Sequence, residues 1–485
     1  MGEERASRLA SLEAFRREGH RPWATLFRPS HRAAEIVAAY PRTEGEEVRV
    51  AGRIMGIRHH GGVSFADLVD GSGRIQLQAR QDLLGERDYG LFLLLHRGDI
   101  VGVKGRVFRT RRGEVTVALE EFRLLAKCLE PLPEKWHGLR EVEIRYRRRY
   151  LDLIANPEAR RVLLTRSRIV SLLRRFLEER GFVEVETPVL TPLYGGARAR
   201  PFTTYHRALD LSLYLRIAPE LYLKRLVVGG MERVFEIGKV FRNEGLSPMH
   251  NPEFTMLELY QAFADYEDMM RLTEEIFSFL AREVLGGFTI TFRGKEIHLE
   301  PPWPRISMVE ALRERLGCDV LAWQSDEEAR LEARRLGLEV EEGATRGRVM
   351  EELVDAFVQP HLVQPTFLLD HPVEISPLAR AREDDPRLSQ RFELIVGGWE
   401  LANAFSELAN PFEQRERFQR QQEEREKGDE EAHAMDEDYL RALECGLPPT
   451  GGLGIGIDRL AMLLAGQDSI REVIPFPLLR PVQEE

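Results

Sequence analysis

The chain has 485 residues, of which 43% are hydrophobic and 31% charged, and its net charge is −11. The length predicts two or more domains, and the composition is that of a soluble globular protein. No apolar run approaches the roughly 20 residues of a membrane span, and the N-terminus lacks an apolar signal-peptide core, so we expect a cytoplasmic protein without a membrane partner. Three distant cysteines without a CxxC pair argue against structural zinc and against disulfides.

The first part of the chain predicts a helical extension followed by a barrel. Residues 1–45 have the pattern of short helices broken by Gly19 and Pro22. Between residues 46 and 130, short alternating segments bounded by glycine turns predict five strands. These strands cover residues 48–54, 64–70, 73–78, 99–105 and 114–117. Their number and order fit a small closed barrel of the OB-fold type, which binds oligonucleotides.

Residues 131–160 contain a proline-rich stretch and are predicted to link the barrel to a larger domain at 161–485. Eleven arginines and four acidic residues lie between Arg140 and Arg175. An arginine run is usually a solvated helical face, but beside an oligonucleotide-binding domain it favours contact with phosphates. Conversely, ten acidic and three basic residues between Glu423 and Glu444 indicate a solubilising surface helix.

The larger domain opens with a predicted amphipathic helix over residues 162–180, which Gly181 ends. Its apolar stripe comprises Val162, Ile169, Leu172, Leu173, Phe176 and Leu177. An alternating strand over residues 181–188 follows and is ended by proline. Further along, residues 308–365 are helical and mixed in composition, and we interpret them as a structural insertion.

Residues 235–260 predict two strands joined by a turn-rich loop. Because strand side chains alternate between faces, Arg242 shares a face with Glu244. On the second strand, one face carries Phe254, Met256, Glu258 and Tyr260. Together with His250 in the loop, these residues form a mixture of cationic, acidic and aromatic groups. A sheet face used only for packing would not carry that mixture, so the hairpin indicates a ligand site.

A second hairpin is predicted over residues 392–407, with Gly397 and Gly398 in a tight turn. Glu393 and Glu400 then lie on one face as diagonal neighbours, roughly 7–8 Å apart at the backbone. Such a carboxylate pair suits magnesium that bridges the phosphates of a nucleotide, although an exposed pair on a solvated strand is the alternative. To bring Asn403 into the same pocket, the strand needs a bulge after Glu400.

The third segment with chemical meaning covers residues 450–466. Gly452, Gly454 and Gly456 share one face and predict a bare strip of sheet on which a flat ligand can lie. Asp458 is placed to cap the following helix, and Arg459 falls in its first turn, where a cation opposes the helix dipole and is better explained by a ligand. The spacing is neither that of a dinucleotide fingerprint nor that of a P-loop.

These segments resemble the three motifs of the class II aminoacyl-tRNA synthetases. Phe241-Arg242-Asn243-Glu244-Gly245 followed by His250-Asn251-Pro252-Glu253-Phe254-Thr255 resembles motif 2, within about 232–262. Residues 162–190 are similar to motif 1 and residues 450–466 to motif 3, and the detail is closest to the lysyl-specific family. The resemblance implies an α+β fold, with an antiparallel catalytic sheet flanked by helices, and a homodimer formed through motif 1.

The resemblance also implies a reaction and the residues that perform it. The expected activity is ATP-dependent activation of L-lysine to lysyl-adenylate, followed by transfer of lysyl to tRNA(Lys), with one to three Mg²⁺ ions and no zinc. The implied catalytic residues are Arg242 and Arg459. The positions that match ATP-binding residues are Arg242, Glu244, His250, Asn251, Phe254, Glu393 and Arg459. Those that match the lysine pocket are Gly196, Glu220, Glu258, Tyr260, Asn403, Phe405 and Glu407. Those that match metal ligands are Glu393 and Glu400, and those that match anticodon-reading residues are Arg58, Phe65 and Gln76.

Several positions keep other interpretations open. Glu220 could merely complement the dipole of its helix, Phe65 could be a core residue, and Gln76 could be a surface strand residue. The chain also departs from the family pattern at Gly62, near Trp399, at Ala404 and at Asn410. The alternative functions are an aspartyl- or asparaginyl-type enzyme of the same class, which Glu220 and Glu258 oppose, and a non-catalytic binding protein derived from a synthetase.

Overall fold

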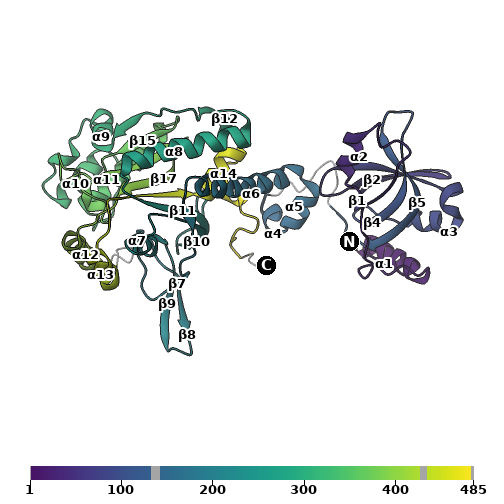
Figure 1. The fold of residues 1–485 in the computed structure, drawn as a ribbon, viewed down its shortest axis with the longest axis horizontal. Coiled ribbons are helices and arrows are strands. Elements are labelled where there is room, and N and C mark those ends of the chain that lie inside the picture. The colour runs from purple at the N-terminus through teal and green to yellow at the C-terminus, as the bar shows by residue number, and fades with distance from the viewer. Residues whose placement is uncertain (1, 133–141, 427–433, 482–485) are drawn as a thin grey trace. The chain divides into compact units, whose positions relative to one another are not determined.

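The computed structural model describes residues 2–132, 142–426 and 434–481, and the chain divides into two compact units, Met1–Arg140 and Glu141–Glu485 (Figure 1). In the smaller unit, the predicted five-stranded barrel is confirmed: the strands close in the order β1-β2-β3-β5-β4. They are β1 (Glu47–His60), β2 (Val63–Val69), β3 (Arg74–Arg80), β4 (Ile100–Arg109) and β5 (Val115–Ala126). The helices of this unit are α1 (Gly2–Arg17), α2 (Ala33–Ala39) and α3 (Gln81–Leu93). Alternate strand residues such as Val50, Leu68 and Leu77 fill the barrel core.

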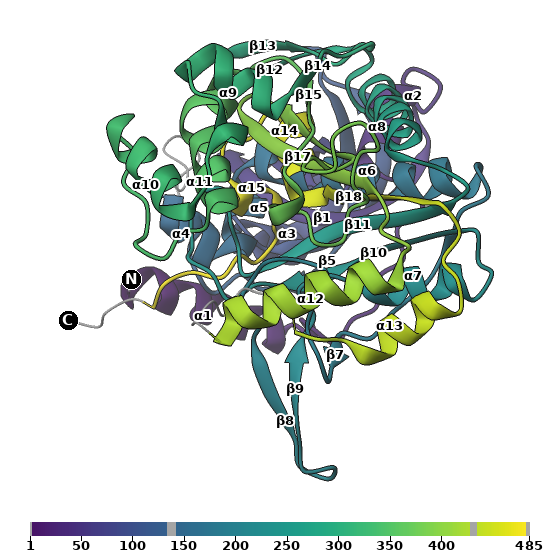
Figure 2. The same cartoon turned by 90° about the vertical axis from the view of Figure 1, so that its left-hand side faces the viewer.

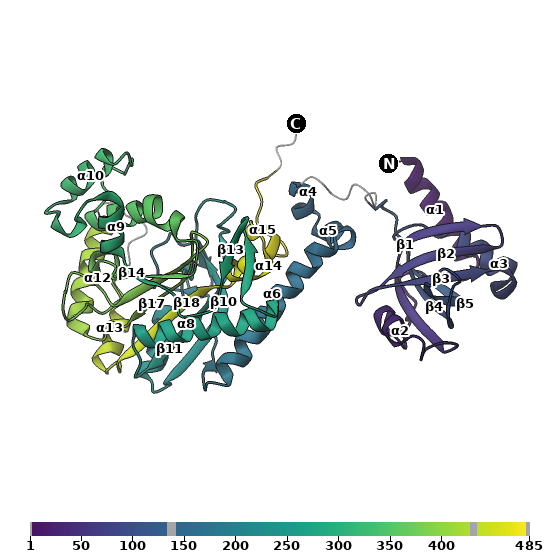
Figure 3. The same cartoon turned by 90° about the horizontal axis from the view of Figure 1, so that it is seen from above.

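The larger unit is built on an eight-stranded sheet that is mostly antiparallel (Figures 1 and 3). Only the terminal pairs β14–β15 and β10–β6 are parallel. In spatial order the strands are β14 (Arg305–Ser307), β15 (Thr366–Leu369), β16 (Arg391–Val396), β17 (Trp399–Ser406), β18 (Thr450–Gly456), β11 (Glu253–Ala262), β10 (Arg233–Phe241) and β6 (Val183–Glu184). The strand predicted over 181–188 is therefore shorter than expected, because only two of its residues pair with β10.

One face of this sheet is covered by α6 (Pro157–Glu178), α8 (Tyr266–Leu280) and α14 (Ile457–Ala465). The predicted apolar stripe of residues 162–180 is buried here, and Asn156 caps the helix by accepting the N–H of Glu158. Leu257 and Leu259 of β11 point into this core, so the even-numbered residues of β11 point to the opposite face. The chemistry predicted for Glu258 and Tyr260 therefore belongs to the face that these helices leave open.

The opposite face is bordered by two groups of helices. At the β10–β11 side, α7 (Glu220–Val228), α12 (Pro411–Glu426) and α13 (Glu437–Glu444) form one apolar cluster, and Figure 2 shows α12 and α13 side by side. At the other side, the predicted insertion packs on Leu368 and Ile395. Its helices are α9 (Met308–Leu316), α10 (Asp326–Arg335) and α11 (Arg346–Leu353). Other short elements of the unit are α15 (Ile470–Val473), β12 (Thr289–Phe292), β13 (Lys295–His298) and the sheet of β7 (Leu190–Thr191), β9 (Leu211–Leu215) and β8 (Thr203–His206).

The predicted linker over 131–160 is helical in most of its described part. Residues 142–160 form α4 (Val142–Arg147), α5 (Arg149–Ala155) and the first turn of α6, whereas residues 133–141 lie outside the described residues. The guanidinium of Arg149 is completely buried, donates to the carbonyl of Pro475 at 3.0 Å and pairs with Asp152 at 2.8 Å. The bond to Pro475 joins α5 to the C-terminal segment, so the larger unit begins before residue 161.

Candidate active site

Two adjoining cavities lie on the open face of the large sheet. The acidic cavity, lined by Glu220 and Glu258, has a volume of about 310 Å³. The loop cavity, lined by the chain between β10 and β11, has a volume of about 250 Å³. The residues that line both are Arg242, Met256, Glu400, Asn403 and Gly454. A ligand that extends from one cavity to the other therefore passes the guanidinium of Arg242.

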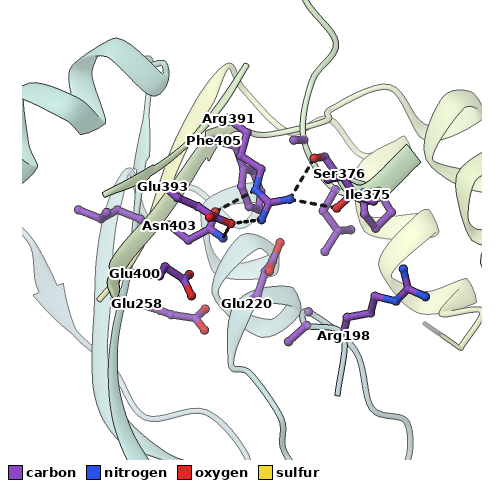
Figure 4. Close-up of a pocket in the computed structure, with 18 of the residues that line it drawn as sticks. Arg198, Glu220, Glu258, Ile375, Ser376, Arg391, Glu393, Glu400, Asn403 and Phe405 are labelled. Carbon is purple, nitrogen blue, oxygen red and sulfur yellow. Dashed lines mark hydrogen bonds and ion pairs between the residues drawn. The ribbon is translucent and has the colours of Figure 1, made fainter. Parts of the chain in front are cut away.

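The acidic cavity gathers six of the seven residues that the resemblance assigned to lysine: Gly196, Glu220, Glu258, Tyr260, Asn403 and Phe405. Glu220 begins α7, and Glu258 is on β11 beside the glycine-rich strand β18, where it pairs with Gly454. Figure 4 shows the carboxylates of Glu220, Glu258 and Glu400 directed into the same space. Gly196 has φ +85°, and a Cβ there would lie 2.9 Å from the Cβ of Glu220, so the wall requires glycine.

Glu258 is a carboxyl group held in a position that favours a cationic ligand. Its side chain is only 4% exposed, and its carboxylate accepts a hydrogen bond from the hydroxyl of Tyr260 at 3.2 Å. Burial raises the pKa of Glu258 to about 8, and the nearby charge of Glu220 adds to the rise. A positive group that entered the cavity would lower this pKa again. A cationic ligand that entered the cavity would therefore displace a proton from Glu258.

The seventh predicted residue, Glu407, is buried next to the cavity instead of lining it. Its carboxylate forms an ion pair with Lys224, which the sequence interpretation did not single out. The Nζ atom of Lys224 is also 2.5 Å from Glu220. Lys224 follows Glu220 by four residues on one helix, so the contact between these two was available from helical spacing. The contact with Glu407 depends on the tertiary fold.

The hairpin over residues 392–407 has the predicted turn and the predicted bulge. Val396 pairs with Trp399 and Ile395 with Glu400, but Leu394 pairs with Ala402, which leaves Leu401 as the extra residue. The bulge places Asn403 opposite Glu393, and its amide donates to that carboxylate at 3.3 Å. Glu400 and Asn403 consequently line the same cavity.

Glu393 also accepts a hydrogen bond from Arg391 at 2.6 Å (Figure 4). Arg391 is a second residue that the sequence interpretation missed, although its spacing of two residues from Glu393 places both on one face. Its guanidinium additionally donates to the carbonyl of Ile375 at 3.0 Å and to the side chain of Asn403 at 3.2 Å. Arg391 thus holds the acidic cavity wall in a fixed arrangement.

Six of the seven predicted ATP-binding residues line the loop cavity: Arg242, Glu244, His250, Asn251, Phe254 and Arg459. The strand β10 ends at Phe241, so Arg242 and Glu244, which the alternation placed on one strand face, both belong to the loop. The N–H of Arg242 still donates to the carbonyl of Pro252 at 2.9 Å. The guanidinium of Arg242 lies 5.2 Å from the ring centre of Phe254. Burial lowers the pKa of Arg242, and the facing carboxylates of Glu244 and Glu400 counteract this effect.

Arg459 closes the far side of the loop cavity. It donates to the backbone carbonyl of Glu400 at 2.8 Å and pairs with the Glu400 carboxylate at 3.4 Å. Its second terminal nitrogen lies 3.1 Å from Nε2 of His250. Burial and the charges of Arg459 and Arg242 lower the pKa of His250, so the imidazole is neutral at pH 7. The cavity therefore presents two guanidinium groups and one neutral imidazole.

The glycine strip on β18 has two uses. Gly454 and Gly456 line the loop cavity, as expected for a bare surface. At Gly452, however, a Cβ would meet the carboxylate of Glu407 and the ring of Tyr260, so this glycine makes room for protein side chains. The predicted capping role of Asp458 is wrong, because α14 has no side-chain cap. Asp458 instead accepts the N–H of Thr255 at 2.7 Å and pairs with Arg166 at 2.8 Å, which ties β11 to two helices.

The two carboxylates matched to metal ligands, Glu393 and Glu400, both line the acidic cavity and a third, neighbouring hollow. Among the residues that the structure describes, no group of three or more His, Cys, Asp or Glu side chains is arranged to hold a metal ion. Two carboxylates suit Mg²⁺ that takes its remaining ligands from phosphate oxygens and water, which is its usual mode beside a nucleotide. The donor set therefore fits magnesium delivered with ATP.

The insertion over residues 308–365 contributes acidic side chains to the site, although its composition predicted only a structural role. Glu351 lines the acidic cavity, and both Glu351 and Asp355 line the neighbouring hollow with Glu393 and Glu400. Burial raises the pKa of Asp355 to about 6, and the charges of Glu393 and Glu400 raise it further. The insertion thus adds acidic groups to the wall of the site, which its mixed composition did not reveal.

The barrel carries the three residues matched to anticodon recognition on neighbouring strands. Arg58 on β1 pairs with Phe65 on β2. Gln76 on β3 pairs with Asp67, which follows Phe65 by two residues on β2. Phe65 is half-buried and lies outside the barrel core, so the core interpretation of this residue is wrong. Asp67 fixes the exposed Arg58 side chain through a hydrogen bond of 3.0 Å. The side chain of Gln76 accepts the hydroxyl of Thr116 at 3.0 Å.

Most of the arginine run has acidic partners within the chain. These ion pairs include Arg145–Asp152, Arg147–Glu143, Arg161–Glu158, Arg166–Asp458 and Arg174–Glu184. These pairs balance much of the positive charge within the unit, and contact of the segment with phosphates stays a prediction. Arg140 lies outside the described residues. Likewise, only residues 423–426 and 434–444 of the acidic segment are described, in the end of α12 and in α13.

The departures from the family pattern have local explanations. Ala404 is completely buried in the core beneath the sheet. Trp399 packs edge-on against Phe292 with 5.0 Å between ring centres. The side chain of Asn410 accepts the N–H of Phe412 at 3.0 Å at the start of α12, as an aspartate would do. Gly62 is exposed in the turn between β1 and β2.

Comparison with known proteins identifies the class that this fold and site define. The family described as "tRNA synthetases class II (D, K and N)" matches residues 141–480, and the "OB-fold nucleic acid binding domain" matches residues 48–125. The chain belongs to the class II tRNA synthetases.

The similar curated proteins carry a more specific name. The chain is 55% identical to the lysine–tRNA ligase of Moorella thermoacetica over 479 residues, which are 99% of this chain and 98% of the relative. It is 55% identical to that of Carboxydothermus hydrogenoformans, over 98% of this chain and 97% of the relative. It is 52% identical to that of Halalkalibacterium halodurans, over 98% of this chain and 96% of the relative. No helix in the part of the chain that the structure describes is long and apolar enough to cross a membrane.

Proposed function

We propose that this protein is a lysine–tRNA ligase, which activates L-lysine with ATP and then transfers the lysyl group to the 3′ end of tRNA(Lys). The observation that carries this proposal is the pair of cavities joined at Arg242, of which one is acidic and the other presents arginines and an aromatic ring. A lysine in the acidic cavity and ATP in the loop cavity meet beside that guanidinium. The sequence relatives named as lysine–tRNA ligases support the same activity.

In the first step, the carboxylate of lysine attacks the α-phosphorus of ATP and pyrophosphate leaves. The attacking group is already ionised at neutral pH, so no general base is needed. Catalysis then consists of aligning the two substrates and neutralising the charge that develops on the phosphorus. Arg242 borders both cavities and is our choice for the residue that contacts the α-phosphate.

The remaining nucleotide contacts follow from the loop cavity. Adenine stacks on Phe254, opposite the guanidinium of Arg459, and Glu244 accepts the adenine amine. His250 and Arg459 contact the outer phosphates, and Asn251 positions the loop, since its side chain bonds to the carbonyl of Glu253 at 2.6 Å and to the N–H of Leu478 at 3.3 Å.

Glu393 and Glu400 are the residues that would hold magnesium. When bound, the ion supplies positive charge to the phosphates and a template for their orientation. Arg391 and Arg459 pair with the two carboxylates at 2.6 and 3.4 Å. The same arginines keep the carboxylates oriented for the incoming nucleotide. Between one and three ions are compatible with this proposal.

Lysine is selected by the acidic cavity. Glu220 and Glu258 bind its ammonium groups, while Gly196, Tyr260 and Phe405 shape the slot. Asn403 donates to the pocket from a position fixed by Glu393 and Arg391. An aspartyl- or asparaginyl-type enzyme would need cationic or amide groups in place of the two glutamates, and a non-catalytic protein would not need the two arginines of the loop cavity.

The second substrate is tRNA(Lys), whose anticodon binds the barrel. Phe65 stacks on an unpaired base, and Arg58 and Gln76 contact base edges on the same face. Asp67 restrains Arg58 before the RNA arrives, which lowers the entropy lost on binding.

We further infer a homodimer formed through motif 1 and a cytoplasmic location. Leu164 on α6 and Val183 on β6 are 61% and 50% exposed, and β6 is an edge strand. The β8–β9 hairpin, which projects from the unit in Figures 1 and 2, also exposes Tyr205. Exposed apolar side chains at a sheet edge indicate a protein interface. The three cysteines are free thiols, which fits a reducing compartment.

ATP–pyrophosphate exchange with single amino acids tests the activity. Lysine should support exchange, whereas aspartate and asparagine should not. Exchange with aspartate or asparagine instead of lysine would establish the alternative enzyme, and no exchange with any amino acid would establish the binding protein.

A further inference from the structure

A lysine side chain is buried beside the acidic cavity. The Nζ atom of Lys224 is 2.5 Å from Glu220 and in contact with Glu407, and the side chain is 0% exposed. It extends from the first turns of α7 toward the end of β17. A buried ammonium group requires compensation, and two carboxylates provide it here.

The charge of Lys224 balances a region that would otherwise be strongly negative. Three carboxyl groups are buried close enough to influence one another's charge: those of Glu220, Glu258 and Glu407. Burial raises the pKa of Glu220 and of Glu407, and the positive charge of Lys224 opposes that rise. Burial alone would lower the pKa of Lys224, but Glu220 and Glu407 outweigh it, and the net pKa is raised. The ammonium group therefore stays charged over the working pH range.

Lys224 is connected to the ligand space through the aromatic wall. Its Nζ atom is 5.9 Å from the ring centre of Tyr260 and 5.3 Å from that of Phe405, and both rings line the acidic cavity. The other groups that face this charge cluster are Tyr439 on α13, whose ring centre is 5.9 Å away, and Glu258 on β11. Arg391 on β16 faces Glu220 from the cavity side.

We propose that Lys224 is a positioning residue that sets the charge of the amino-acid pocket, so that the pocket accepts the ammonium group of its substrate and no second cation. The inference rests on the proposed function. Lys224 pairs with Glu407 and favours the ionised form of Glu220 beside the cavity. Glu258 is then the carboxylate whose charge the substrate must balance. Without Lys224, the buried carboxylates would take up protons, and the substrate would have to displace them.

A double-mutant cycle on Lys224→Met and Glu407→Gln tests this proposal, with lysine-dependent ATP–pyrophosphate exchange as the assay. Lys224→Met should raise the KM for lysine at least tenfold at pH 7 and leave the KM for ATP within twofold. Its lysine KM should also depend more steeply on pH between 6 and 8 than that of the wild type, because an additional proton must leave. In the double variant, the lysine KM and its pH dependence should both return most of the way to the wild-type values.

The matched control is the exposed pair of Lys239 and Glu253, whose charged atoms lie 3.3 Å apart in the same unit. Lys239→Met, Glu253→Gln and their combination should leave the lysine KM and its pH dependence unchanged. A Lys224→Met enzyme with the lysine KM and pH profile of the wild type would overturn the proposal. So would equal losses in the lysine and ATP constants without recovery in the double variant, because that is the pattern of general damage.

If Lys224→Met does not yield folded protein, the double variant decides, since it removes one charge of each sign. A folded double variant with a lysine KM within tenfold of wild type supports charge balancing. A double variant that also fails to fold, or that folds with a lysine KM raised more than tenfold, contradicts it. Absence of lysine-dependent exchange in the wild type would instead refute the proposed function.

Discussion

The most specific prediction concerns the pH dependence of lysine binding through Glu258. Its pKa of about 8 in the empty pocket means that about one tenth of the molecules have an ionised Glu258 at pH 7. Ionising the rest at that pH costs about 1.4 kcal/mol, which is taken from the binding energy of lysine. Below pH 8, the KM for lysine should thus fall by about tenfold for each unit by which the pH rises.

The direction of this pH dependence follows from the raised pKa of Glu258. A carboxyl group whose pKa is raised holds its proton in the free enzyme and loses it when the ammonium group enters. Raising the pH removes that proton in advance, so binding improves through the range from pH 6 to 8 and levels off above it. Lysine-dependent ATP–pyrophosphate exchange across pH 6–9 gives this profile, and the KM for ATP measured in parallel provides an internal reference.

Glu258→Gln separates this effect from general effects of pH. The amide cannot ionise, so the steep pH dependence should disappear. Leaving a buried ammonium group without its charged partner costs about 3–5 kcal/mol, so the lysine KM should rise by about two to four orders of magnitude. The exposed Glu253 on the same strand gives the matched control, Glu253→Gln. A Glu258→Gln enzyme with unchanged lysine affinity and pH profile would refute the assignment.

Three further predictions address other parts of the molecule. Arg242→Ala should reduce lysine-dependent exchange by at least about 10³-fold, as expected for loss of a transition-state contact, and near-normal exchange would remove it from the mechanism. Phe65→Ala should weaken tRNA charging by about 1–3 kcal/mol and spare exchange, and equal loss of both would contradict a separate anticodon role. Leu164→Arg should convert a dimer into monomers in light scattering, and an unchanged mass would place the interface elsewhere.

The parts of the site that the sequence predicts well are local. The turn at Gly397–Gly398 fixes the register of its hairpin, and the shared pocket then demands the bulge that the structure has at Leu401. The closed barrel follows from strand spacing in the same way. In each case, a short-range rule constrains neighbouring residues strongly.

The parts that sequence reasoning missed depend on contacts between distant segments. The pairing of Lys224 with Glu407 joins residues 183 positions apart, and no local pattern signals it. The same is true of Asp458, whose carboxylate bonds to Thr255 instead of capping its own helix. Composition made residues 142–160 look like a linker, whereas burial of Arg149 makes them part of the larger unit.

The two cavities that meet at Arg242 should hold the two halves of one lysyl-adenylate molecule. A crystal structure with a non-hydrolysable lysyl-adenylate analogue tests it directly. We predict adenosine in the loop cavity against Phe254, the phosphate mimic beside Arg242, and the lysyl ammonium group within hydrogen-bond distance of Glu220 or Glu258. An analogue bound in another cavity, or one whose ammonium group occupies the loop cavity, would contradict the account.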